Sequence, residues 1–261
     1  DIYRLNVELV LFLIFALFLF CFAGWTGAKA LLSFLFTALT IWKLLIPFFL
    51  KGYDPVWISV LMTSLCTVVI ILLIGGFTRK SMVALSGSVS GVVVTALLAT
   101  IFGYYFQIPG TVREFAEPLM YNGFFDLDFS KIFIAGIFIS AAGAVMDVAM
   151  DIAASQEEIA LRHPGLPARE LVLSGFRISR AVIGTMTTTL LFAYSGSYTF
   201  VLMLLMAKGM PMINIFNTNY IASEIFQTLV GSFGLVLVAP LTSLIGAFVY
   251  SKTINTKISQ S

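Results

Sequence analysis

Long, nearly uninterrupted apolar runs are the feature that most constrains how this chain can fold. A helix that crosses the hydrocarbon core of a bilayer needs about 20 mostly apolar residues. Seven segments meet or approach that length: Leu9–Phe22, Leu31–Leu50, Val56–Phe77, Met82–Phe106, Ile132–Ala153, Ala181–Met206 and Ile225–Tyr250. Because the runs are continuous rather than alternating, they predict helices and not strands. The sequence therefore predicts an all-α, polytopic transmembrane helix bundle that forms a single domain over residues 1–261.

The composition excludes several other classes of protein. Of the 261 residues, 59% are hydrophobic and 11% are charged, whereas a soluble domain averages about 45–50% and about 25%. The net charge of +2 does not suggest nucleic-acid binding. Cys21, Cys66 and the single histidine, His163, have no metal-ligand spacing, so we expect no metal site and no cofactor. No small-residue cleavage site follows the first run, so we expect a retained span rather than a signal peptide.

Basic residues are divided unequally between the two sets of loops. The side that the C-terminus reaches carries Lys29, Arg79, Lys80, Arg162, Arg169, Arg177, Arg180, Lys252 and Lys257. Since cytoplasmic loops are enriched in Lys and Arg, we expect the C-terminus inside and the N-terminus outside. Residues 107–130 then form an external loop with a helix in the interface plane, and residues 155–180 form a charged cytoplasmic loop. Pro164 and Pro167 are expected to divide the cytoplasmic loop into two short helices.

Two carboxylates within the fifth run are candidates for a proton or cation relay. Gly136, Ser140, Gly143 and Asp147 follow one another at spacings of four, three and four, which places them on one helical face, and Asp151 continues that face. A carboxylate at the bilayer centre costs about 2.5–3.5 kcal/mol on insertion scales, so such groups usually pair, face a bundle interior or serve a function.

The alternative is that the two aspartates only form salt bridges. Asp151 lies in the cytoplasmic third of its run, close to Arg177 and Arg180 in the expected bundle. We take these two arginines as the candidate charge partners, and the structural role is the more common one for Asp151. For Asp147, one turn deeper, a functional and a structural role remain equally open.

The sixth run is rich in hydroxyl side chains and suggests a polar path. The candidate path residues are Gly184, Thr185, Thr187, Thr188, Thr189, Tyr194 and Ser195. Residues 194–198 are also a possible helix break that exposes backbone carbonyls, as in transporter sites. Helix packing is the competing explanation. Threonine needs no polar path to be tolerated in a membrane, because its hydroxyl can bond the carbonyl one turn back.

The remaining motifs favour packing rather than catalysis. Gly87 and Gly91 form a GxxxG motif, which predicts a close helix contact. The last run has no lysine for a retinal Schiff base, and His163 lies in a loop, where it cannot serve an intramembrane serine nucleophile. Asp147 and Asp151 share one helix, whereas an aspartyl protease needs them on two. We therefore expect a protein that is not an enzyme.

The fifth and sixth runs resemble the YibE/F-like family of bacterial membrane proteins. The resemblance is carried by residues 143–155, His163-Pro164, Ser174-Gly175 and residues 180–194, and the chain is similar to the short, YibF-type members. It implies a multi-pass protein of the bacterial plasma membrane. Since such genes often occur in pairs, it also implies a paralogous membrane subunit as partner, with a homo-oligomer as the other arrangement.

The chain departs from the family pattern within the sixth run. Ser179, Ala181 and Thr188 stand where the family usually has Gly, Asp and Asn. If that Asp and Asn are functional, the departure implies a degenerate partner or a shifted role. Two functions follow: a transporter or permease subunit with a polar intramembrane path, or a non-transporting assembly or scaffold subunit.

Overall fold

The structure is a bundle of helices. The computed structural model describes residues 2–107 and 109–258, and those residues contain no strand. The long helices are α1 (Ile2–Thr40), α3 (Pro55–Gly75), α4 (Arg79–Phe106), α6 (Phe129–Arg162), α7 (Ala168–Ala207) and α9 (Asn219–Ile258). Short elements are a π-helical turn (Ile41–Leu45), α2 (Ile46–Leu50), a 3-10 turn (Gly110–Val112), α5 (Ala116–Tyr121) and α8 (Met212–Asn217). The predicted all-α class is confirmed.

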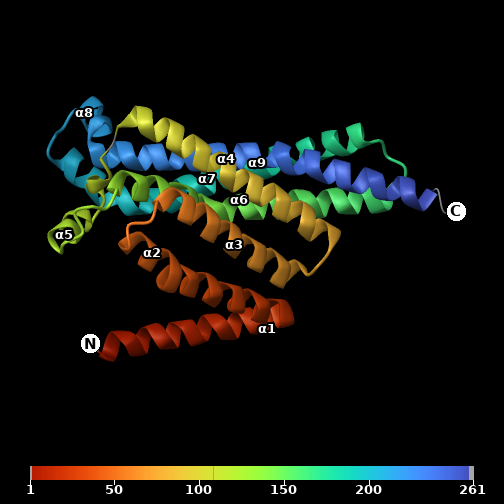
Figure 1. The fold of residues 1–261 in the computed structure, drawn as a ribbon, viewed down its shortest axis with the longest axis horizontal. Coiled ribbons are helices and arrows are strands. Elements are labelled where there is room, and N and C mark those ends of the chain that lie inside the picture. Colours follow the sequence, from red (N-terminus) through yellow and green to blue (C-terminus); the bar gives the residue numbers. More distant parts are fainter. Residues whose placement is uncertain (1, 108, 259–261) are drawn as a thin grey trace.

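Helix α1 is interrupted by a reversal of the chain. Gly24 has φ 53° and ψ −129°, a backbone conformation that glycine adopts without a steric penalty. A Cβ on Gly27 would lie 2.2 Å from the carbonyl oxygen of Leu19, so glycine is also needed where the two arms approach. Figure 1 shows the second arm running back toward α2, beside the first.

In the part of the chain that the structure describes, five helices are long and apolar enough to cross a membrane. They are Tyr3–Leu50, Pro55–Gly75, Arg79–Phe106, Phe129–Arg162 and Asn219–Ser251. The number rises to six when Ala168–Gly196 and Tyr198–Ala207, bent by 64°, are taken as one span. Each of the seven predicted spans overlaps a helix, but Val56–Phe77 runs two residues past the end of α3, and the first two spans belong to one continuous stretch of 48 residues. The count of seven and the orientation stay predictions.

The long helices lie along one axis of the molecule. In Figure 1, α4, α6, α7 and α9 form the main body, α3 lies on its lower side, and α1 with α2 lies outermost. The chain starts at the end that carries α5 and α8, here called the α5 end, and α9 finishes at the opposite end. This arrangement brings the fifth and sixth predicted spans, in α6 and α7, next to the last one, in α9.

The predicted GxxxG motif lies where α4 crosses α6 and α9. A Cβ on Gly87 would lie 2.2 Å from Thr242 Oγ1. A Cβ on Gly91 would lie 2.7 Å from a Val238 methyl and 2.8 Å from a Val145 methyl. The close helix contact that the motif predicts is therefore present, and it joins three helices at Gly91.

Further small residues allow close contact elsewhere in the core. A Cβ on Gly234 would lie 2.2 Å from Thr95 Oγ1. The helices α4 and α9 are therefore also in close contact at a glycine of α9.

Gln156 of α6 is fully buried, and its Nε2 donates to the Leu171 carbonyl at 2.9 Å. That amide lies against Gly175 of α7, where a Cβ would be 2.4 Å away. These contacts set how far α6 and α7 are shifted along each other.

Two segments expected as loops differ from that expectation. Residues 155–180 are helical except for the turn around Pro164, because α6 continues to Arg162 and α7 begins at Ala168. Pro164 and Pro167 separate two helices, but these are the ends of α6, with 34 residues, and of α7, with 40 residues, and not the two short helices that the sequence predicts. In residues 107–130, the helix α5 has only six residues, Ala116–Tyr121.

Asp54 caps α3 and ties it to α6. Its Oδ1 accepts from the Val56 and Trp57 backbone N–H groups at 3.0 and 3.3 Å, and its Oδ2 lies 2.8 Å from Lys131 Nζ. The hydrogen bond from Lys131 lowers the pKa of Asp54 from its usual value; partial burial opposes this shift and the two backbone bonds support it. The pair lies where α3 and α6 meet at the α5 end.

Replacing Gly91 with valine should destabilise the bundle. The added side chain would overlap both Val238 and Val145, and overpacking of this kind costs about 1–3 kcal/mol. We expect Gly91→Val to lower the Tm of the purified protein in detergent. Val93→Leu adds bulk to an exposed position of the same helix and serves as the control. Equal Tm values for the two variants would contradict the close crossing.

Replacing Asp54 with asparagine should alter the dependence of stability on pH. Because the folded-state pKa of Asp54 is lowered, its stabilisation is present above the unfolded pKa of about 3.9 and disappears as the pH falls through the folded value. We expect wild type to have the higher Tm at pH 7 and to approach Asp54→Asn below about pH 4. Asp126→Asn, at an exposed position, should show no such convergence.

Candidate functional site

The loop before α6 brings an arginine to the bundle. Gly110 lies directly on the start of α6, since a Cβ there would be 1.9 Å from the Phe129 carbonyl oxygen, and its N–H donates to Ser130 Oγ at 3.3 Å. Arg113 follows three residues later, and its guanidinium Cζ lies 4.8 Å from the centre of the Phe133 ring. The loop is thereby held so that Arg113 points toward α9.

Arg113 forms an ion pair with a buried glutamate. Its Nη1 donates to Glu224 Oε1, and its Nη2 donates to Gln227 Oε1. The side chain of Glu224 is 2% exposed and that of Arg113 is 31% exposed, so the acid is inside the bundle and the base is at its edge. A buried carboxylate is tolerated only when it is paired and hydrogen-bonded. Arg113 therefore supplies the charge that Glu224 requires.

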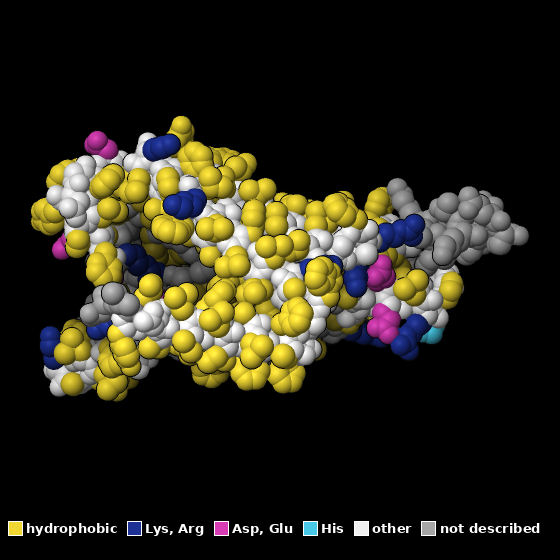
Figure 2. Space-filling model, turned by 90° about the horizontal axis from the view of Figure 1, so that it is seen from below, with side chains coloured by type: hydrophobic (Ala, Val, Ile, Leu, Met, Phe, Trp, Pro, Cys, Tyr) yellow, Lys and Arg dark blue, Asp and Glu magenta, His cyan; other side chains and the backbone are white. Residues whose placement is uncertain are grey.

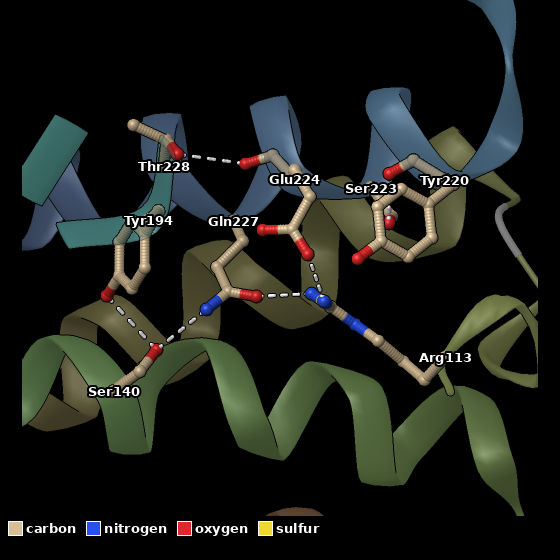
Figure 3. A network of polar contacts seen from close by, with 8 residues as sticks. All are labelled: Arg113, Ser140, Tyr194, Tyr220, Ser223, Glu224, Gln227 and Thr228. Carbon is tan, nitrogen blue, oxygen red and sulfur yellow. Dashed lines mark hydrogen bonds and ion pairs between the residues drawn. The ribbon is translucent and has the colours of Figure 1, made fainter. Parts of the chain in front are cut away.

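Gln227 extends this pair to α6 and α7. Its Nε2 donates to Ser140 Oγ at 3.1 Å, and the Tyr194 hydroxyl donates to the same oxygen, also at 3.1 Å. Figure 3 shows the resulting chain of contacts, in which Gln227 of α9 lies between Arg113 and Ser140. Four segments that are far apart in sequence, the loop and helices α6, α7 and α9, thus meet at one polar network.

Two cavities adjoin the network. One, of about 570 Å³, is lined by Arg113, Glu114, Ala193, Tyr194, Tyr220, Glu224 and Gln227. The other, of about 410 Å³, shares Arg113, Glu114 and Gln227 with the first and extends along α6 to Gly136. Figure 2 shows the molecule hollowed at its α5 end, with a Lys or Arg side chain inside the hollow. The network is therefore reachable from outside the bundle.

The candidate relay carboxylates continue from the network along α6. Ser140, Gly143, Asp147 and Asp151 are all exposed on one stripe of the single chain. The acids are not brought against the arginines that the sequence suggests as charge partners. Within residues 2–107 and 109–258, neither aspartate forms an ion pair with Arg177 or Arg180.

The hydroxyls of the candidate path are bonded to their own helix. Thr185, Thr188 and Thr189 donate to carbonyls three or four residues earlier, at 3.0, 3.3 and 3.1 Å, and Ser195 does the same at 3.1 Å. Gly184 and the three threonines are exposed. They therefore form an outward polar stripe on α7.

Two further path residues lie closer to the bundle. Thr187 is half-buried, and Tyr194 joins the polar network through Ser140. Helix α7 bends by 64° between Gly196 and Tyr198, where the sequence predicts a break. The bend follows Tyr194, which lines the larger cavity together with Arg113 and Glu224.

The buried pair is the part of the site that sequence reasoning missed. Arg113 and Glu224 are 111 residues apart, and the apolar runs place both in loops or at span ends on the external side. The available signal was the position of Glu224 at the very start of the last apolar run, where an unpaired acid would be costly. Its partner could not be chosen from the sequence, because several external basic residues were equally suitable.

Comparison with known proteins identifies the family. The sequence pattern of the YibE/F-like protein family matches residues 11–252, nearly the whole chain. The chain therefore belongs to the YibE/F-like family, and it is a membrane protein whose helices are long and apolar enough to span a bilayer. Neither the curated proteins nor the solved structures contain a match to it.

The effects of removing the two members of the buried ion pair should not be additive. Arg113→Ala leaves the buried Glu224 carboxylate without its counter-charge, and we expect a loss of about 3 kcal/mol, seen as a lower Tm. The double variant Arg113→Ala/Glu224→Ala should lose less than the sum of the two single variants. Glu117→Ala, at an exposed position of α5, is the control. Strict additivity would contradict the pairing.

Proposed function

We propose that this protein is a transporter or permease subunit of the bacterial plasma membrane, with a polar intramembrane path for protons or small cations. The role is non-enzymatic. The observation that carries the proposal is the Arg113–Glu224 ion pair, which lies beside a cavity open to the outside of the bundle. Replacing a buried ion pair with apolar residues is often neutral or stabilising. A functional role explains why the ionisable pair is kept at this buried position.

The proposed path crosses a seven-span bundle. The stretch Tyr3–Leu50 would be about 72 Å long as one straight helix, more than twice the hydrocarbon thickness, and Gly24 divides it into two arms. With these two arms, α3, α4, α6, α7 and α9 make seven crossings. The excess of basic residues on the side of α9's end supports a cytoplasmic C-terminus and an external α5 end.

Polar groups of α9 and α6 supply successive positions for a proton or cation. Glu224 provides a carboxylate at the α5 end, and Gln227 and Ser140 provide an amide and a hydroxyl in direct contact. Asp147 follows Ser140 by seven residues, about 10.5 Å along the helix, and Gly143 leaves space between them. A cation that binds Glu224 would compete with Arg113 for the carboxylate. Binding of the cation would therefore be linked to release of the loop arginine.

A flux measurement with the purified chain tests this proposal. Liposomes containing the protein would be loaded with the pH dye pyranine and subjected to proton, Na⁺ and K⁺ gradients in turn. We expect faster dissipation of at least one gradient than in empty liposomes. Asp147→Asn and Glu224→Gln should abolish that difference, because each removes a proposed binding carboxylate while retaining its size.

The matched controls are conservative changes away from the path. Glu117→Gln and Asp126→Asn remove exposed loop carboxylates and should leave the flux unchanged. Thr188→Val tests whether the α7 stripe contributes. If every gradient decays at the rate of empty liposomes, or if Asp147→Asn, Glu224→Gln and Thr188→Val all behave as wild type, the transport proposal fails.

A non-transporting scaffold subunit is the second candidate function. It is favoured by one observation, that the threonine hydroxyls of α7 are already bonded to their own backbone and so have no free donor to offer a solute. In this case the protein would hold a partner, such as a paralogous subunit, and changes at Arg162 or Arg169 would impair assembly more than changes at Asp147. Glu158–Arg162, an exposed pair at 2.6 Å, lies on that charged end.

A further inference from the structure

The glycines of the spanning helices fall into two groups. Most of them, such as Gly91 and Gly234, have a neighbouring atom within 4 Å of the point where a Cβ would lie. Four glycines with ordinary helical φ have none: Gly136 and Gly143 on α6, and Gly184 and Gly196 on α7. In a membrane protein, small residues allow neighbouring helices to approach. At these four positions the small residue is present but no neighbouring helix is in contact with it; Gly143 borders a cavity that α1 and α3 bound on its other side.

Charged side chains of both signs lie on the same pair of helices. Asp147 and Asp151 on α6, and Arg180 on α7, are exposed. No ion pair joins any of them to another side chain in the part of the chain that the structure describes. Glu224 differs from these exposed groups, because its buried carboxylate forms an ion pair with Arg113 within the same chain.

Asp151 and Arg180 lie at the same depth along the bundle. The two helices are antiparallel, and Gly175 of α7 is in contact with the side chain of Gln156 of α6. Asp151 precedes Gln156 by five residues, and Arg180 follows Gly175 by five residues. Both positions are therefore displaced from that contact by about 7.5 Å in the same direction. Asp151 on α6 and Arg180 on α7 are therefore both exposed, at the same depth along the bundle axis.

Lipid is an unfavourable cover for this face. A carboxylate facing the hydrocarbon costs about 2.5–3.5 kcal/mol near the bilayer centre, and such groups normally face protein or water. Asp147 lies one turn deeper than Asp151, at the level of the exposed threonines of α7. A cover that supplies basic and polar groups at these depths would remove the cost.

We propose that this face binds the same face of a second copy of the chain. We define the α6/α7 face by its exposed residues Gly143, Asp147, Asp151, Arg180, Gly184 and Thr188. In the proposed dimer, Asp151 of each copy pairs with Arg180 of the other. The inference stands independently of transport, because it rests on the exposure and charge of the face.

The symmetry of membrane insertion favours a second copy over another partner. Two copies inserted in the same orientation are related by a two-fold axis along the membrane normal, so residues at equal depth can meet. In such an isologous contact, residue i of one copy touches j of the other, and j touches i. Asp151 and Arg180 have opposite charges and equal depth, so the face is complementary to itself. The open glycines Gly143 and Gly184 allow the backbones to approach.

A charge-exchange experiment tests the dimer in the membrane. Asp151→Arg alone creates a copy with two bases at the contact, and Arg180→Asp alone creates one with two acids. Each should lose self-association because like charges meet. Co-expressed under two different affinity tags, the two variants should co-purify, since each Arg of one then faces an Asp of the other. A role of Asp151 and Arg180 within one chain cannot produce this mutual rescue.

Disulfide cross-linking gives a second measurement. With Cys21 and Cys66 replaced by alanine in both, a copy with Gly143→Cys and a differently tagged copy with Thr188→Cys should form a cross-linked dimer in native membranes under mild oxidation. The two positions lie at equal depth, each 13 residues from the contact of Gln156 with Gly175. Leu97→Cys, exposed on α4, should form no cross-linked dimer in place of Thr188→Cys. A wild-type chain that does not co-purify with a differently tagged copy would overturn the proposal, and so would failure of the mixed variants to associate. If only a paralogous subunit is cross-linked at Thr188→Cys, the second-copy assignment is wrong.

Discussion

Close approach of α4, α6 and α9 is the constraint on which the rest of the structure depends. Apolar side chains provide little driving force for association in a bilayer, because the lipid tails are equally apolar. Contact through small residues therefore matters, and Gly91 brings α4 within reach of Val145 and Val238 at once. This crossing fixes α6 against α9, and so places Ser140 within hydrogen-bonding distance of Gln227.

The polar network depends on that packed core and also on the loop outside it. Glu224 is held inside the bundle by α9, while Arg113 reaches it from a loop that Gly110 presses against the start of α6. The same helices carry the exposed stripe of Gly143 and Asp147. Transport and dimerisation would thus use adjoining parts of α6, one facing the cavities and the other facing a second copy. A path bounded by two copies is compatible with both.

Much of the fold could be predicted because its signals are local. Apolar runs identify helices by length, GxxxG at Gly87–Gly91 identifies a close crossing, and Tyr194–Tyr198 identifies the bend of α7. The boundaries in residues 155–180 were less accurate, since hydropathy marks where a helix leaves the lipid and not where its hydrogen bonding ends. The charge partner of Glu224 was beyond reach, because pairing depends on distances between helices.

The sequence by itself determined that this is an all-helical membrane protein of the YibE/F-like family, with Asp147 and Asp151 on the small-residue face of α6. The family follows from the match of the sequence pattern, whereas periodicity and composition suffice for the helical class and for the place of the two aspartates, since each of these concerns one helix and its solvent. Only the tertiary structure decided that Glu224 is buried against Arg113, and that the face carrying Asp147 points out of the single chain. Both depend on how helices far apart in sequence are rotated and packed, which no single helix encodes.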